Sequence, residues 1–159
     1  MTIRSMNEDD LPAVSWVFSK CYRWLGRLEN YTSQQIEFLV SKRASLESLT
    51  REYQTQQYLV ACEGADVVGM VAVSGNEITK LYVVPDHHRK QIGTQLFGAT
   101  EAAIRNAGHE SLVLGAFPTS VQFYRAVGLI VTARKPHGPG PLAGLSVTLM
   151  ENQLTRPEA

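Results

Sequence analysis

The chain has 159 residues, of which 44% are hydrophobic, and it carries 15 basic and 15 acidic residues. This length and composition predict a single folded domain over residues 1–159 and argue against extensive disorder. The formal net charge of zero argues against a general nucleic-acid binder. No apolar run approaches the roughly 20 residues that cross a bilayer, which argues against a membrane-spanning protein.

The two cysteines, Cys21 and Cys62, lack the spacing of a metal-binding pair or of a disulfide framework. The N-terminal sequence "MTIRSMNEDD" is polar and has no apolar stretch of the kind found in signal peptides. We therefore expect two reduced core thiols in a cytoplasmic protein that has no metal site.

The N-terminal third of the chain is predicted to form a short strand, "TIRS", and two helices. Asn7 is a suitable N-cap for the first helix, whose apolar residues recur at spacings of three and four and define one buried face. Gly26 is expected to end this helix. Thr32 and Gln35 form the pattern of a capping box at the start of the second helix. Serines and threonines near residues 45–50 leave the end of that helix undefined.

From Gln57 onward the hydrophobic period changes to that of strands. Three consecutive strands, "YLVACE", "VVGMVAVSG" and "EITKLYVVP", precede a helix that is expected to end at Gly108. A strand, "SLVLGA", a short helix, "SVQFYRAVGL", and a final pair of strands follow. The order β-α-α-β-β-β-α-β-α-β-β, with mostly antiparallel strands, indicates an α+β fold.

The stretch "EITKLYVVPDHHRKQIGTQLF" combines a strand, a basic turn that begins at Pro85, and the start of a helix. The N-terminus of a helix has free N–H groups and a partial positive charge, so it can bind phosphate. Gly93 would let the backbone approach a ligand, while Arg89 and Lys90 add charge and Thr94 adds a hydroxyl. Neither a P-loop nor a dinucleotide-binding fingerprint is present. These residues alone leave two alternatives open, a pyrophosphate site and a solvated basic turn.

The same segment resembles the central motif of the GNAT superfamily of acyl-CoA-dependent N-acetyltransferases. That motif reads Gln/Arg-x-x-Gly-x-Gly/Ala after a strand and a proline-containing turn, and His88, Gln91 and Gly93 occupy its three defined positions. The stretch "SLVLGAFPTSVQFYRAVGL" resembles the second signature of the family, and the element order matches its fold. The resemblance implies a central mixed, mostly antiparallel sheet of about seven strands flanked by about four helices.

The sequence departs from the family pattern at three positions. Gln91 replaces the first glycine of the motif, and His88 replaces its leading Gln or Arg. With ordinary backbone dihedrals Gln91 could still present its N–H to a phosphate, along a slightly different loop path. Phe117 stands where many members carry an asparagine that contacts the pantetheine arm. Its side chain cannot form a hydrogen bond but could pack on that arm.

The resemblance implies that acetyl-CoA is the acyl donor, that no metal is needed, and that a splayed strand binds the pantetheine through its backbone. The Val83 N–H would then donate to the acetyl oxygen, an interaction that can stabilise a transition state by ~3 kcal/mol. The residues expected to contact the cofactor are Leu81, Tyr82, Val83, His88, Arg89, Lys90, Gln91, Ile92, Gly93, Thr94 and Phe117.

Two side chains are candidates for proton transfer by the same resemblance. Glu77 begins the strand that contains Val83, and by the two-residue period it shares a face with it, as a general base for the amine would. Tyr124 matches the tyrosine that protonates the leaving thiolate in this family. The alternatives are a solvated residue at the strand end for Glu77 and a core aromatic for Tyr124.

Weaker candidates for the acceptor site are His137, in the loop between the last two strands, and Trp24 and Tyr31, near the connection of the first two helices. For His137 a surface position is the alternative that the sequence favours.

We thus predict an N-acetyltransferase that moves an acetyl group from acetyl-CoA directly to an amine, with a small-molecule acceptor slightly favoured. A protein N-terminus and a lysine side chain remain open as acceptors. A non-catalytic acyl-CoA-binding regulatory domain on the same fold and an unrelated α+β interaction domain are the rival hypotheses. The apolar final strands also leave a homodimer open, and no nucleic-acid or membrane partner is expected.

Overall fold

The computed structural model describes residues 1–154, and its strands form one seven-stranded sheet in the order β1-β2-β3-β4-β5-β7-β6. All neighbouring strands are antiparallel except β4 and β5, which are parallel. The strands are β1 (Thr2–Ser5), β2 (Gln57–Glu63), β3 (Asp66–Ser74), β4 (Glu77–Val83), β5 (Ser111–Ala116), β6 (Ile130–Pro136) and β7 (Ser146–Gln153).

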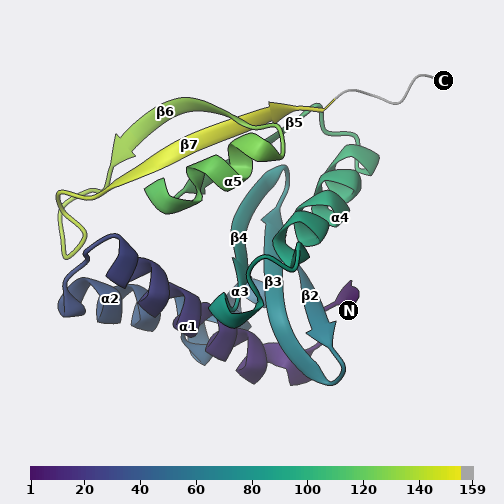
Figure 1. Ribbon diagram of the computed structural model, residues 1–159, viewed down its shortest axis with the longest axis horizontal. Helices are drawn as coiled ribbons and strands as arrows, with labels where there is room; N and C mark the ends of the chain where they lie inside the picture. Colours follow the sequence, from purple (N-terminus) through teal and green to yellow (C-terminus); the bar gives the residue numbers. More distant parts are fainter. Residues whose placement is uncertain (155–159) are drawn as a thin grey trace.

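The helices follow the predicted order between these strands (Figure 1). They are α1 (Leu11–Leu28), α2 (Ser33–Leu39), α3 (Leu46–Tyr53), α4 (Ile92–Asn106) and α5 (Val121–Ala126), with a π turn, η2 (Val40–Ala44), between α2 and α3. Single 3₁₀ turns are η1 (Glu8–Asp10), η3 (Pro85–His87) and η4 (Pro118–Ser120). With α2 and α3 taken as the one helical region that the sequence predicts, the predicted seven strands and four helices are confirmed.

Helices cover both faces of the sheet. The ring of Tyr82 on β4 packs on Phe18 of α1, with ring centroids 4.6 Å apart. Its neighbour Val83 points to the opposite face, because successive strand residues alternate. There the Val83 side chain lies near Gly93 and Leu96 lies close to Gly69, which places α4 on that face. The helices α1 and α4 therefore bury opposite faces of β3 and β4 in one hydrophobic core.

The predicted helix starts are confirmed. The Asn7 side chain accepts a hydrogen bond from the Asp9 N–H at 2.9 Å, at the start of the 3₁₀ turn that leads into α1. At the start of α2, the Gln35 N–H donates to Thr32 Oγ1 at 3.1 Å, and the Thr32 N–H donates to Gln35 Oε1 at 3.0 Å. This reciprocal pair is the capping box that the spacing predicts.

The prediction that Gly26 ends the first helix is wrong, because α1 continues to Leu28. Gly26 is buried, and a Cβ at this position would lie 2.5 Å from Cγ1 of Ile36 in α2. This glycine therefore serves the close packing of α1 on α2. The chain turns instead at Asn30, which adopts a left-handed conformation with φ 58°, as asparagine does more readily than most residues.

The sheet opens between β4 and β5. Their pairing consists of Glu77 opposite Val113 and Ile78 opposite Leu114, after which the two strands diverge. In Figure 1, β6 and β7 are accordingly turned away from β2, β3 and β4. The N–H of Val84 donates to the Val68 carbonyl on β3. Since backbone groups alternate along a strand, the N–H groups of Leu81 and Val83 face the open side.

Both cysteines are free and buried, as the sequence predicts. Among residues 1–154, no helix combines the length and the apolar character that crossing a membrane requires.

Candidate active site

Two hollows lie on either side of the opening between β4 and β5. The first, of about 400 Å³, lies along β4, α4 and α5 and is called the groove. The second, of about 510 Å³, lies between β4, β5, the α2–π-turn region and the β6–β7 loop and is called the cavity. A third, smaller hollow lies between them and is called the gap. Leu81, Ser120 and Tyr124 line both gap and groove, while Tyr82 and Phe117 line both gap and cavity.

The floor of the groove is the strand-turn-helix segment that the sequence singled out. His88 Nε2 lies 2.8 Å from the Val83 carbonyl oxygen, where it can donate a hydrogen bond across the open side of β4. The His88 ring also packs edge-on against Trp24 of α1, with centroids 4.9 Å apart. The Cys21 thiol donates to the same Val83 carbonyl at 3.3 Å, and burial raises its pKa to about 12, which keeps it protonated at neutral pH.

The loop before α4 has an unusual backbone. Arg89 and Gln91 both adopt left-handed conformations, with φ 71° and φ 59°. Gln91 therefore does not have the ordinary backbone dihedrals under which the sequence analysis expected its N–H to face a phosphate. Gln91 takes the conformation that glycine adopts freely, which costs a residue with a side chain roughly 1–2 kcal/mol. Such turns direct successive N–H groups to one side and can form an anion-binding concavity.

Tyr124 lies where the groove meets the gap. It is buried on α5, with its ring 5.1 Å from that of Phe123 and 6.5 Å from that of Phe97 on α4. Loss of solvation raises the pKa of the Tyr124 phenol well above its usual value of 10. The hydroxyl therefore stays protonated at neutral pH, in a form that can donate a proton.

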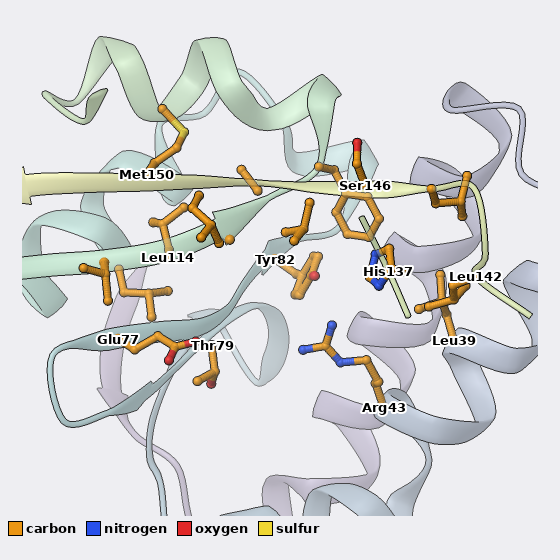
Figure 2. A pocket seen from close by; sticks show the side chains of 18 of the residues that line it. Leu39, Arg43, Glu77, Thr79, Tyr82, Leu114, His137, Leu142, Ser146 and Met150 are labelled. Atoms are coloured by element: carbon orange, nitrogen blue, oxygen red, sulfur yellow. The ribbon is translucent and has the colours of Figure 1, made fainter. Parts of the chain in front are cut away.

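The cavity combines polar groups from distant parts of the chain, as Figure 2 shows. Glu77 and Thr79 come from β4, Arg43 from the π turn, and His137 from the start of the β6–β7 loop. Tyr31 lines the cavity as well, and burial, with smaller effects of Glu29 and Tyr22, raises its pKa to about 12. The apolar lining includes Leu39, Val113, Leu114, Leu142, Leu145, Val147, Leu149 and Met150.

Arg43 projects into the cavity toward Tyr82 (Figure 2). Desolvation lowers the pKa of its guanidinium, but the neighbouring Tyr22, Tyr82, Glu52 and Glu77 raise it, and the net direction is upward. The guanidinium is therefore charged at every physiological pH.

A second cation, Lys80, is buried nearby and already has an ion-pair partner. Lys80 forms an ion pair with Glu52 of α3, and the Tyr58 hydroxyl donates to the same carboxylate at 3.1 Å. Burial lowers the pKa of Lys80, an effect that the bond to Glu52 opposes. This cluster belongs to the core and neutralises its own charge, so it leaves Arg43 as the fixed positive charge of the cavity lining.

The structure separates the predicted site residues into the two hollows. Leu81, Val83, His88, Arg89, Gln91, Ile92, Gly93, Thr94 and Tyr124 line the groove. Glu77, Tyr82 and Phe117 line the cavity, and Lys90 lines neither hollow.

The sequence also suggested three weaker candidates for the acceptor site. Tyr31 lines the cavity, whereas Trp24 lies in the groove. His137 is half-buried and lines the cavity, so the surface position that the sequence favours for it is wrong.

Sequence reasoning missed Arg43, because only the π turn directs it into the cavity. It also missed Thr119, which lines the groove and whose N–H donates to Glu29 at the end of α1 at 2.8 Å. No group of three or more metal-binding side chains occurs within the part of the chain that the structure describes.

Comparisons with known proteins agree with this architecture. A family model described as an acetyltransferase (GNAT) domain matches residues 27–151, which is most of the chain. The fold is similar to that of a GCN5-related N-acetyltransferase from Rhodopseudomonas palustris, with a TM-score of 0.88 and 23% identity over 96% of this chain and 95% of that one.

Two further structures contain a bound cofactor. PaiA N-acetyltransferase from Thermoplasma acidophilum, in complex with coenzyme A, has a TM-score of 0.79 and 21% identity over 96% of this chain and 98% of that one. YncA from Salmonella typhimurium, with its cofactor acetyl-CoA, has a TM-score of 0.69 and 21% identity over 100% of this chain and 96% of that one. At these identities the likeness shows a shared fold.

Proposed function

The chain belongs to the GNAT acetyltransferase family, and from that premise we propose that it transfers an acetyl group from acetyl-CoA directly to a small-molecule amine. The observation that carries this proposal is the gap between β4 and β5, which lies between the groove and the cavity, with Tyr124 lining the groove and the gap and Glu77 lining the cavity. A thioester that enters from the groove would meet an amine that enters from the cavity.

The groove suits the cofactor. The left-handed turn at Arg89 and Gln91 and the start of α4 supply N–H groups for the pyrophosphate, and the charges of Arg89 and Lys90 add attraction. The free N–H groups of Leu81 and Val83 would pair with the pantetheine as an added strand does. The Val83 N–H is our candidate donor to the acetyl oxygen, where negative charge develops.

The proposed proton transfers follow from the two sides of the gap. An alkylamine with a pKa of about 10 is protonated when it enters the cavity at neutral pH, and Glu77 would accept its proton, directly or through a water molecule. The neutral nitrogen then attacks the thioester carbon, a C–N bond forms, and the C–S bond breaks. Tyr124, which is protonated at neutral pH and lines the gap, would give its proton to the leaving thiolate.

The size of the cavity supports a small-molecule acceptor. A volume of about 510 Å³ lies within the roughly 300–1,000 Å³ typical of small-ligand sites. The β6–β7 loop, with His137 and Leu142, contributes to its wall. Phe117, at the junction, could pack on the pantetheine arm and on the acceptor at the same time.

The test is calorimetric titration with acetyl-CoA, followed by an acetyl-transfer assay over a panel of amines. We expect micromolar binding of acetyl-CoA and transfer to at least one small amine. Binding without transfer, with Tyr124→Phe behaving as wild type, would instead support a non-catalytic acyl-CoA-binding domain. Absence of binding by the folded protein would overturn the proposal.

A further inference from the structure

The cavity presents two opposite charges that come from different elements. Glu77 lies at the start of β4, and Arg43 projects into the cavity from the π turn that follows α2 (Figure 2). Both side chains are exposed to the cavity, and neither forms an ion pair with any residue among positions 1–154. The charges are therefore free to interact with a bound molecule.

Two carboxylates, Glu52 and Glu77, lie close enough to Arg43 to raise the pKa of its guanidinium. Glu52 is already paired with Lys80, whereas Glu77 has no ion pair among residues 1–154. Arg43 lines the partly apolar cavity without an ion-pair partner among residues 1–154, so its guanidinium can donate hydrogen bonds to a carboxylate that enters there. Arg43 thus has the position of a recognition group.

The π turn fixes the Arg43 backbone in this position. The Ser48 hydroxyl donates to the Lys42 carbonyl at 2.8 Å, and the Ser15 hydroxyl of α1 donates to the Ala44 carbonyl at 2.6 Å. These bonds hold the residues on both sides of Arg43. Short π segments occur frequently at functional sites, because the extra residue in the turn changes the direction of the side chain.

We propose that the acceptor is a small zwitterionic amine, whose carboxylate is bound by Arg43, whose amine lies at Glu77, and whose body contacts the apolar lining. This inference rests on the proposed function and names the class of its acceptor. The planar guanidinium matches a carboxylate with two parallel hydrogen bonds. The apolar lining of Leu39, Leu114, Leu142 and Met150 suits a hydrocarbon body between the two charges.

The test compares matched pairs of amines in the acetyl-transfer assay. Leucine, phenylalanine, 4-aminobutyrate and 6-aminohexanoate are each assayed beside the corresponding amide, which keeps the amine and removes the carboxylate. We expect at least one acid to exceed its amide by about tenfold or more in kcat/KM, as a charged hydrogen-bonded pair implies.

Variants of Arg43 then test whether this residue causes the preference for an acid over its amide. Arg43→Gln should raise KM for the preferred acid by about ten- to a hundredfold, with kcat nearly unchanged, and should leave the amide unaffected. Arg43→Lys should restore part of the loss, because it keeps the charge without the fork. The matched control is Lys42→Gln, an exposed neighbour in the same turn that should change nothing.

Equilibrium titration of the same acids into the CoA-loaded protein separates the two proposals. Transfer to amides and acids alike, or an equal loss on both in Arg43→Gln, overturns the zwitterion proposal and leaves the acetyltransferase proposal standing. Binding of an acid that is lost in Arg43→Gln, without transfer to any amine, supports the carboxylate site and contradicts the enzyme. Neither binding nor transfer overturns both.

Discussion

The groove and the cavity meet at the same gap, yet they are built in different ways. The groove is formed largely by one continuous stretch, residues 81–94, which presents backbone groups, a basic turn and the start of α4. The cavity is formed by side chains from the α1–α2 connection, α2, the π turn, β4, β5, the last two strands and the β6–β7 loop.

This difference separates what the fold provides from what is particular to the chain. In our proposal, the groove recognises the cofactor through the path of the main chain, which would tolerate Gln91 in place of a glycine. The proposed recognition in the cavity depends instead on single side chains such as Arg43 and Glu77, which a few substitutions could redirect. We therefore expect cofactor use to follow the family and acceptor choice to be specific to this sequence.

The largest expected effect is at the gap itself. Tyr124→Phe removes the proton donor and should lower kcat by about 10²–10³-fold, within the range of general-acid catalysis, while the Kd for acetyl-CoA stays within about twofold. Tyr53→Phe, which loses a hydroxyl that donates to the Met6 carbonyl away from both hollows, is the control and should keep kcat. An equal loss of cofactor affinity in Tyr124→Phe would show a packing role instead.

The pH dependence of activity can test the direction in which burial shifts the pKa of Tyr124. Because burial stabilises the neutral phenol, its proton is lost only above the ordinary pKa of 10. Activity should therefore show no decline from this group as pH rises to 9. A basic limb below pH 9 that disappears in Tyr124→Phe would contradict the assignment.

A somewhat smaller effect is expected on the cavity side. Glu77→Gln should lower kcat/KM by about 10²-fold at pH 7, and the loss should shrink toward pH 10, where the amine is already neutral. Glu63→Gln, at the end of β2, is the matched control. A loss that does not change with pH would point to a structural role for Glu77.

Cofactor affinity tests the groove. Replacing Arg89 and Lys90 together by alanine should weaken acetyl-CoA binding by about ten- to a hundredfold, and the difference from wild type should shrink as salt screens the charges. The double replacement of Arg134 and Lys135, an exposed basic pair on β6, removes the same charge elsewhere and should leave the affinity unchanged. Calorimetry at two salt concentrations measures both.

The smallest effect concerns the strained turn. Gln91→Gly should stabilise the protein by about 1 kcal/mol, which raises Tm by roughly 2–4 °C, because glycine adopts the left-handed conformation without a steric cost. Gln95→Gly, on the exposed side of α4, should have the opposite sign, since glycine weakens a helix interior. Thermal unfolding of both variants would decide whether the turn is strained.

The same contrast explains how much the sequence could predict. Periodicity and caps predicted the element order, because these features depend on neighbouring residues. The motif at residues 88–94 indicated a candidate phosphate-binding segment, and all of its residues except Lys90 line the groove. Gly26 was misjudged because its role is to accept Ile36 from another helix, a contact that local sequence does not reveal. Arg43 was missed for a similar reason, since no sequence signal marked the π turn that directs it.

The position of His137, in the β6–β7 loop, could likewise not be predicted from the local sequence. Its position at the cavity depends on how the loop folds back, where the His137 N–H donates to the Leu145 carbonyl at 2.9 Å. Glycines and prolines predicted a loop here, but the closing contact joins residues eight positions apart, which their pattern does not specify. Side chains that converge from distant segments thus need the fold before they can be assigned.

The most direct test of the central claim is a crystal structure of the protein with acetyl-CoA. Our account predicts the pyrophosphate against the N–H groups at the start of α4, the acetyl oxygen on the Val83 N–H, and the thioester sulfur within hydrogen-bonding reach of the Tyr124 hydroxyl, with the acetyl group facing Glu77 through the gap. A cofactor that lies outside the groove, or whose thioester points away from the cavity, would contradict it.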